Sequence, residues 1–190
     1  MKKISILFAS MFLMVNTYAQ NTWTIDKSHS KVGFSVTHMA VSETEGNFKD
    51  FDGKVISKSD DFNGADVEFT AKVASINTEN EKRDGHLKSD EFFNAEKFPD
   101  VKFKGILVKE NGKYVLKGKF TMRDVTKDVA FDVTYGGTVK AFGGVKAGFK
   151  FNGIINRQDY QLKWSKNLES GELVLGDDVE LIVKIELNKA

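Results

Sequence analysis

The stretch from Tyr114 to Tyr135 reads YVLKGKFTMRDVTKDVAFDVTY, and it decides how the rest of the chain is interpreted. In each half of this stretch every second residue is apolar or small. The first set is Tyr114, Leu116, Gly118, Phe120 and Met122, and the second is Val129, Phe131, Val133 and Tyr135. A period of two with one apolar face is typical of a half-buried antiparallel strand. The stretch therefore predicts two strands.

The same alternation recurs along most of the chain. It covers residues 32–38, 67–73, 101–103, 147–151, 160–164 and 179–187. Turn-forming pairs punctuate these runs: Asn63-Gly64, Asn111-Gly112, Gly136-Gly137, Gly143-Gly144 and Gly176-Asp177. Many short strands with frequent turns predict an all-β sandwich or a closed barrel of about eight strands, and alternation alone does not separate the two.

One segment between the strands has a different pattern. Residues 79–97 are rich in charge and compatible with a helix, and Pro99 marks the end of the segment. Ser89-Asp90-Glu91 is a suitable cap for a short helix that would begin before Phe92 and Phe93. We expect a short helical insertion near residues 80–98 that plugs one end of the barrel.

Length and composition limit the class of protein. The chain has 190 residues, of which 41% are hydrophobic, and its 28 Lys and Arg nearly balance 27 Asp and Glu. This length fits one globular domain with its own core, over residues 20–190. The balanced charge lacks the basic footprint of a nucleic-acid binder. Because the chain has no cysteine, disulfides, a cysteine nucleophile and cysteine-based metal centres are excluded.

The first nineteen residues have the pattern of a secretory signal peptide. Lys2 and Lys3 precede an apolar stretch over residues 4–15, and Thr17 and Ala19 occupy the small-residue positions before a cleavage site. The apolar run is short for a membrane-spanning helix, which disfavours an uncleaved anchor. We predict cleavage after Ala19, a periplasmic or secreted location, and no stable membrane insertion of the mature protein.

The polar residues contain no recognisable catalytic motif, so we predict no catalytic residues and no enzyme. No Gly-x-Ser-x-Gly elbow or phosphate-binding glycine loop is present. His29, His38 and His86 are potential metal ligands, but their spacing matches no familiar metal pattern. Local hydrogen bonds in a turn around His29, made by Asp26, Ser28 and Ser30, are the simpler interpretation, and we predict no metal site.

Arg157 and the sixteen phenylalanines each allow two interpretations. Arg157 and Asp159 on one strand would face the same way, as a surface ion pair or as a rim arginine that meets an anionic head group. The phenylalanines either fill a large aromatic core or line a barrel that encloses one small ligand. The sequence does not separate a filled barrel from a hollow one.

Several motifs, in order, resemble those of one family of exported lipid-binding proteins, the YceI-like family. They lie at residues 23–38, Gly46-Asn47-Phe48, Phe51-Asp52-Gly53, 83–95, 118–126, 155–160 and 176–179. The similarity spans about residues 22–187. It departs from the family pattern at Asp124, Asp128 and Gln161, where Gly, Pro and Gly are common, which puts the local turn geometry in question.

The resemblance implies a lipocalin-like, extended antiparallel barrel that holds a polyisoprenoid-type amphiphile, such as an isoprenoid quinone or a polyprenyl phosphate, for carriage or sequestration. No other cofactor is expected. The candidate tail-binding residues are Phe34, Val36, Phe69, Phe103, Phe120, Phe131, Phe149 and Phe151. The candidate head-group residues are His38, Arg83, His86 and Arg157.

Two other functions stay open at this point. One is a metal- or cofactor-using redox protein that acts through His29, His38 and His86. The other is a stress or interaction protein with a filled barrel, whose working surface would be an exposed apolar patch. A homodimer is compatible with the sequence but is not required by it.

Overall fold

The computed structural model describes residues 20–190, so the predicted signal peptide lies outside the described residues. The prediction of an all-β fold is confirmed. The strands are β1 (Asn21–Ile25), β2 (Lys31–His38), β3 (Ser42–Phe48), β4 (Phe51–Ser57), β5 (Ala65–Lys72), β6 (Ile76–Asn77), β7 (Asp100–Glu110), β8 (Lys113–Met122), β9 (Val125–Ala141), β10 (Gly144–Asn156) and β11 (Leu175–Lys189). The helices are α1 (Glu81–Lys88) and the short 3-10 turns η1 (Lys27–His29), η2 (Val73–Ser75) and η3 (Arg157–Tyr160).

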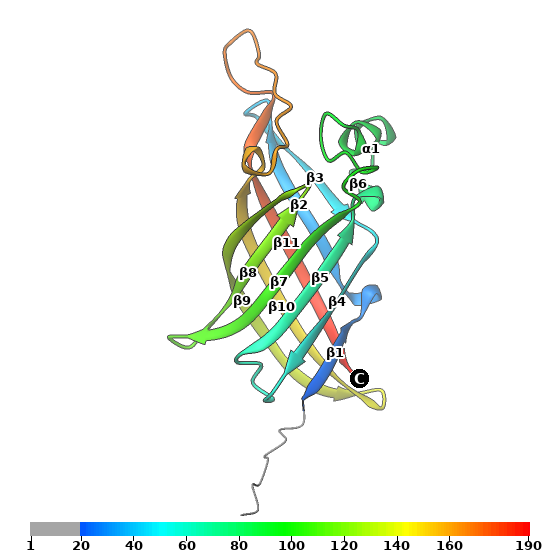
Figure 1. The fold of residues 1–190 in the computed structure, drawn as a ribbon, viewed down its shortest axis with the longest axis vertical. Helices are drawn as coiled ribbons and strands as arrows, with labels where there is room; N and C mark the ends of the chain where they lie inside the picture. Colours follow the sequence, from blue (N-terminus) through cyan, green and yellow to red (C-terminus); the bar gives the residue numbers. More distant parts are fainter. Residues whose placement is uncertain (1–19) are drawn as a thin grey trace, which may run out of the picture.

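The strands close into an elongated barrel rather than a sandwich (Figure 1). The closed ring runs β1-β4-β5-β7-β8-β9-β10-β11, with β11 paired back to β1, and every pairing is antiparallel. Strand β11 is shared, because its C-terminal part pairs with β1 and its N-terminal part pairs with β2. Strand β11 therefore runs along the barrel from the part that contains β2 to the part that contains β1.

Alternation places one face of each strand inside the barrel. In β8, Tyr114, Leu116, Phe120 and Met122 are all buried, as the sequence pattern predicts. Gly118 shares this face and lies so close to Gly105 of β7 that a Cβ atom would be 2.6 Å from its neighbour's Cα. The inward face of the barrel is therefore almost wholly apolar.

The turn predicted around His29 is present between β1 and β2. Asp26 caps η1 by accepting a hydrogen bond from the Ser28 amide at 3.1 Å, and its other carboxylate oxygen lies 3.0 Å from His29 Nδ1. The Ser30 hydroxyl accepts a hydrogen bond from the Glu186 amide at 2.9 Å. This turn connects β1, in the lower half of the barrel as drawn in Figure 1, to β2, in the upper half.

Four local predictions were wrong. The helix in the insertion begins after Asn80, which caps the Arg83 amide, and it ends at Ser89, so Ser89 stops the helix instead of starting it. Residues 160–164 are not a strand but part of η3 and the irregular segment after it, although their apolar residues alternate. Gly136-Gly137 and Gly176-Asp177 are not hairpin turns, because the first pair lies inside β9 at a bulge opposite Gly148 and the second lies inside β11 where its register to β2 shifts.

Two segments gather at the upper end of the barrel in Figure 1. One consists of α1 and the turn that follows it, and the other is the loop between η3 and β11. Phe92 of the first segment and Leu162 of the second are both buried in the main core. The insertion thus lies at one end of the barrel, where its apolar residues help to close it.

Candidate functional site

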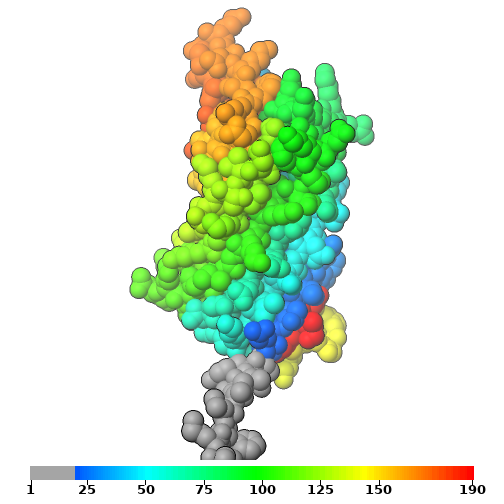
Figure 2. All heavy atoms as spheres, in the orientation of Figure 1, coloured from blue at the N-terminus to red at the C-terminus, as the bar shows by residue number. Residues whose placement is uncertain are grey.

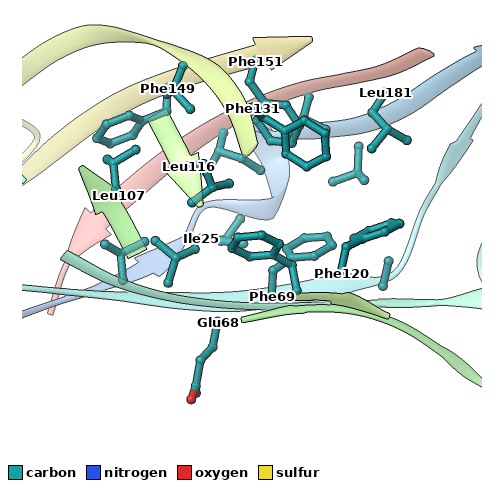
Figure 3. Close-up of a pocket in the computed structure, with 18 of the residues that line it drawn as sticks. Ile25, Glu68, Phe69, Leu107, Leu116, Phe120, Phe131, Phe149, Phe151 and Leu181 are labelled. Atoms are coloured by element: carbon teal, nitrogen blue, oxygen red, sulfur yellow. The ribbon is translucent and has the colours of Figure 1, made fainter. Parts of the chain in front are cut away.

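An apolar cavity of about 150 Å³ lies inside the barrel (Figure 3). Its walls come from β1, β2 and β3 on one side and from β4, β5, β7, β8, β9, β10 and β11 around the rest. Glu68 belongs to the wall only through its backbone, because its side chain points away from the cavity (Figure 3) toward Lys54 at 3.2 Å and Lys104 at 2.8 Å. The side chains that face the interior are apolar.

The structure brings six of the eight predicted tail-binding residues together around this cavity. These are Phe69, Phe103, Phe120, Phe131, Phe149 and Phe151. Phe131 and Phe151 stack at 5.2 Å between ring centroids with only 13° between their planes. Phe34 instead packs on Phe48 at 6.0 Å, and Val36 is buried beside β11 without lining the cavity. Their proposed contact with a ligand stays a prediction.

Aromatic rings close the lower end of the cavity. Phe62, from the loop between β4 and β5, is fully buried and lies 4.9 Å from Trp23, 5.7 Å from Tyr135 and 5.0 Å from Phe149 between ring centroids. We call Trp23, Phe62, Tyr114, Tyr135 and Phe149 the aromatic floor. The sequence analysis missed Phe62, whose only signal is a single aromatic residue in an otherwise polar turn.

Arginines hold the upper end in place. Arg157 has an exposed fraction of only 3% and donates hydrogen bonds to the main-chain oxygens of Leu162 (2.5 Å), Trp164 (2.8 Å), Leu175 (3.3 Å) and Gly176 (2.8 Å). Burial lowers the pKa of its guanidinium from the ordinary value. These bonds tie the irregular segment after η3 to the start of β11.

The predicted pairing of Arg157 with Asp159 was wrong. The two residues lie in η3, where side chains do not alternate as in a strand, and Arg157 binds Asp177 at 2.9 Å instead. Asp159 binds Lys127 at 2.9 Å. The Arg157 guanidinium thus has protein partners on several sides, which is the usual state of a buried cation.

The other predicted head-group residues lie on two elements, Arg83 and His86 on α1 and His38 at the end of β2. Arg83 donates to the hydroxyl and carbonyl of Thr78 at 2.8 and 2.7 Å, and thereby fixes the start of α1. The His86 ring contacts Glu91 and packs edge-on against Phe92 and Trp164. His38 is half-buried at the end of β2. His86 packs on Trp164 and His38 pairs with Leu175, and the carbonyls of both of these neighbours accept hydrogen bonds from Arg157, so these residues lie around one end of the barrel. Their contact with a head group stays a prediction.

Arg123, the third arginine of the chain, also binds the upper segments. Its Nη1 donates to the carbonyls of Phe92 (2.7 Å) and Gln161 (2.9 Å), so one side chain links both upper segments. The guanidinium also lies 5.3 Å from the centre of the Phe98 ring. All three arginines of the chain thus bind oxygens of the protein itself.

The three histidines belong to three different elements: η1, the end of β2 and α1. Among residues 20–190, one group of three has metal-ligand atoms close together, namely Asp26, His29 and Glu186. Lys146 places its ammonium 2.9 Å from Asp26 and 2.6 Å from Glu186. These contacts raise the pKa of Lys146, so a protein cation already pairs with both carboxylates.

This architecture defines a class of protein: a lipocalin-like closed barrel around an apolar interior. A family model described as the YceI-like domain matches residues 23–187. The chain therefore belongs to the YceI-like family, as the sequence motifs indicated. No helix within residues 20–190 has the length and apolar character needed to cross a membrane.

Relatives agree with this assignment. The UPF0312 protein SA2479 of Staphylococcus aureus is 36% identical over 87% of this chain and 96% of its own length. The solved Campylobacter jejuni YCEI protein is 35% identical, with a TM-score of 0.69 over 88% of this chain and 97% of its own. A polyisoprenoid binding domain from Saccharophagus degradans shares the fold at 13% identity, with a TM-score of 0.62, over 88% of this chain and 98% of its own.

Proposed function

We propose that this protein is an exported lipid-binding protein that holds a polyisoprenoid-type amphiphile in its barrel for carriage or sequestration. The observation that carries the proposal is the apolar cavity, whose inward-facing side chains are aliphatic or aromatic. A related fold described as a polyisoprenoid binding domain supports the same class of ligand. The absence of a catalytic motif in the sequence supports a binding protein rather than an enzyme.

The driving force is the burial of an apolar tail. Removing apolar surface from water stabilises a complex by roughly 25 cal/mol per Å². A dry apolar cavity of about 150 Å³ holds a molecule the size of benzene. A longer tail would extend beyond this space, and Phe69, Phe149 and Phe151 are the side chains best placed to move aside for it, because they line the cavity and are only partly buried.

The head group is better matched by an uncharged isoprenoid quinone than by a polyprenyl phosphate. A phosphate would be expected to use arginine, which binds it through two parallel hydrogen bonds. Arg83, Arg123 and Arg157 all donate to oxygens of the protein. Recruiting Nη1 of Arg123 or of Arg157 would break contacts that hold the upper segments in place, and within residues 20–190 the Arg123 Nε is the one buried side-chain donor without a partner.

Native mass spectrometry of the protein purified from its own host, followed by organic extraction, tests this proposal. We expect a bound isoprenoid of defined mass. N-terminal sequencing of the same sample tests cleavage after Ala19, and fractionation of the host tests the periplasmic or secreted location. A protein that carries no lipid, and that takes up neither quinones nor polyprenols, would overturn the binding proposal.

A matched pair of variants on β10 locates the ligand. Phe151→Gln places an amide in the cavity wall, whereas Ile154→Gln changes a residue on the same strand that is largely exposed. We expect lipid uptake to fall at least tenfold in the first variant and to stay unchanged in the second. Equal uptake by both variants would place the ligand outside the barrel.

The small cavity also favours a second candidate, a filled barrel that works through its surface. In that case the phenylalanines form a rigid core and no lipid enters. The same extraction distinguishes the two, because a filled barrel stays empty when incubated with excess isoprenoid. A change in tryptophan fluorescence or in near-UV circular dichroism on adding a quinone would indicate that the aromatic rings move. This result would support the lipid-binding function.

A further inference from the structure

The turn between β9 and β10 presents a bulky apolar residue in an unfavourable conformation. Phe142 is completely exposed, with a relative accessibility of 102%, and its φ of +51° lies in the left-handed region. A bulky residue with positive φ is a rare outlier. Neither core packing nor turn chemistry explains why a phenylalanine occupies this position.

Another hairpin of the same chain shows the residue that suits this turn. Asn111 and Gly112, between β7 and β8, have φ values of +50° and +80°, and Phe142 and Gly143 have +51° and +79°. Asn-Gly is the favoured pair for this backbone. The β9–β10 turn therefore has the same geometry with a phenylalanine in the asparagine position, which exposes an aromatic ring at a cost in conformational energy.

The tip of this hairpin pairs with no other strand among residues 20–190. Strand β9 pairs with β8 only as far as Val133, and β10 pairs with β11 only from Lys146 onward. Beyond these points the two strands of the hairpin pair only with each other, and in Figures 1 and 2 the hairpin (yellow) ends at the lower edge of the barrel. A narrow convex tip of this kind suits insertion into a deformable surface.

The composition of the hairpin identifies the surface. From Thr134 to Phe149 it contains no acidic residue, and Val139 is also largely exposed. Of its two lysines, Lys146 pairs with Asp26 and Glu186, and Lys140 lies exposed in the tip. An exposed aromatic beside a lysine suits the interface of a bilayer, where the ring contacts acyl chains and the ammonium stays at the head groups. We propose that the tip formed by residues 139–143 docks this protein on a lipid membrane.

The opposite end of the barrel has an apolar tip that fits a membrane less well. Val41, beside the β2–β3 turn, is 87% exposed, and Met39 in that turn also has a positive φ. That hairpin carries Glu43 and Glu45, which anionic head groups repel. Its turn is also tied down, because the Met39 amide donates to the carbonyl of Val174 at 2.9 Å.

The docking hairpin also forms part of the cavity wall. Val133 and Phe149, at its base, line the apolar cavity, and Tyr135 stacks on Phe149 at 4.9 Å. Gly136 and Gly137 form the β-bulge opposite Gly148, which gives the hairpin a natural point of bending. Docking at residues 139–143 therefore brings a membrane next to the aromatic floor.

Flotation with vesicles of phosphatidylcholine and phosphatidylglycerol (3:1), free of isoprenoid, tests the docking site. We expect the wild-type protein to float and Phe142→Asn to bind about tenfold more weakly, since burying one phenylalanine is worth at least that ratio. Phe142→Asn keeps a favourable turn, so it is expected to fold. Val41→Asn is the matched control at the other end and is expected to bind like the wild type.

A second variant gives an independent readout. Phe142→Trp is expected to keep vesicle binding and to show a blue-shifted emission when vesicles are added. The two native tryptophans are not expected to respond, because Trp23 is buried and Trp164 packs on Phe92 at the other end of the barrel. The proposal would be overturned if the wild-type protein did not float, or if Phe142→Asn bound vesicles as well as the wild type. It would also be overturned if Val41→Asn lost more vesicle binding than Phe142→Asn. Because the vesicles contain no isoprenoid, these outcomes are independent of whether the barrel carries one.

Discussion

The two ends of the barrel are closed by different kinds of interaction. At the lower end Phe62 sits among aromatic rings, with Trp23 at 4.9 Å and Phe149 at 5.0 Å. At the upper end Arg157 and Arg123 donate to main-chain carbonyls of segments that have little regular structure. Apolar contact closes the lower end, whereas at the upper end directional hydrogen bonds add to the packing of Phe92 and Leu162.

The difference separates two ways of closing the end of a barrel. Ring packing depends on the shape and area of the buried rings. The arginine contacts depend on a few donors at fixed distances, so losing one donor leaves several carbonyls without partners. Substitutions at Phe62 and Arg157 therefore separate the two modes of closure.

The largest effect is expected at the lower end. Phe62→Ala removes a fully buried ring and leaves a cavity between Trp23, Tyr135 and Phe149. We expect the free energy of unfolding to fall by about 3–5 kcal/mol, the usual cost of this substitution in a core. Urea unfolding followed by far-UV circular dichroism measures it.

A matched phenylalanine in the same half of the molecule serves as the control. Phe142→Ala removes a ring that is completely exposed, and we expect it to change the free energy of unfolding by less than about 0.5 kcal/mol. If Phe62→Ala also costs less than about 1 kcal/mol, the aromatic floor is not a packed unit, and the contrast between the two ends fails.

At the upper end, Arg157→Met keeps most of the side-chain volume but removes every donor. Four main-chain oxygens and Asp177 lose a partner, although the Asp177 carboxylate is partly exposed and regains water. We expect the free energy of unfolding to fall by about 2–4 kcal/mol. Amide hydrogen exchange across residues 161–175 is expected to speed up more than exchange in β8. Uniform acceleration would mean that the segment does not open by itself.

The strands were the part of the fold that the sequence predicted best. In β8 the inward parity of Leu116, Phe120 and Met122 is visible because the strand is long and regularly paired on both sides. Tyr160, Leu162 and Trp164 have the same alternation, yet they form η3 and an irregular segment. Their position depends on Arg157, whose acceptors are main-chain oxygens that carry no sequence signal.

The candidate site was predicted in part for the same reason. Phe131, Phe149 and Phe151 face the cavity because strand parity places them on the inward side. Parity does not tell how far along the barrel a residue lies, so Phe34 was grouped with them although it packs on Phe48 instead. Phe62 belongs to a loop, where no periodicity indicates burial.

A smaller effect is expected at the helix of the upper end. The Asn80 side chain accepts a hydrogen bond from the Arg83 amide at 3.0 Å and caps α1. Asn80→Ala is expected to cost about 1 kcal/mol, and hydrogen exchange is expected to rise first within residues 81–88. Asp90→Ala, at an exposed position after the helix, is the control. Equal effects of the two variants would mean that the cap does not stabilise this end.

The smallest effect is expected at Asp26, where β1 turns into β2 between the two halves of the barrel. A hydrogen bond from the Ser28 hydroxyl, with further contacts from Lys146 and His29, holds the pKa of this carboxyl well below its ordinary value of 3.8. Because the folded state favours the ionised form, this contribution to stability is present above pH 3.8 and is lost as the pH falls below it.

Asp26→Asn tests this sign, since it keeps the shape of the side chain and removes its charge. We expect the variant to be less stable than the wild type at about pH 7, and the difference between them to shrink toward about pH 3. Urea unfolding at several pH values measures both curves. A difference that stays constant with pH would show that the Asp26 charge does not link the two halves, and that the turn depends on the shape of the side chain alone.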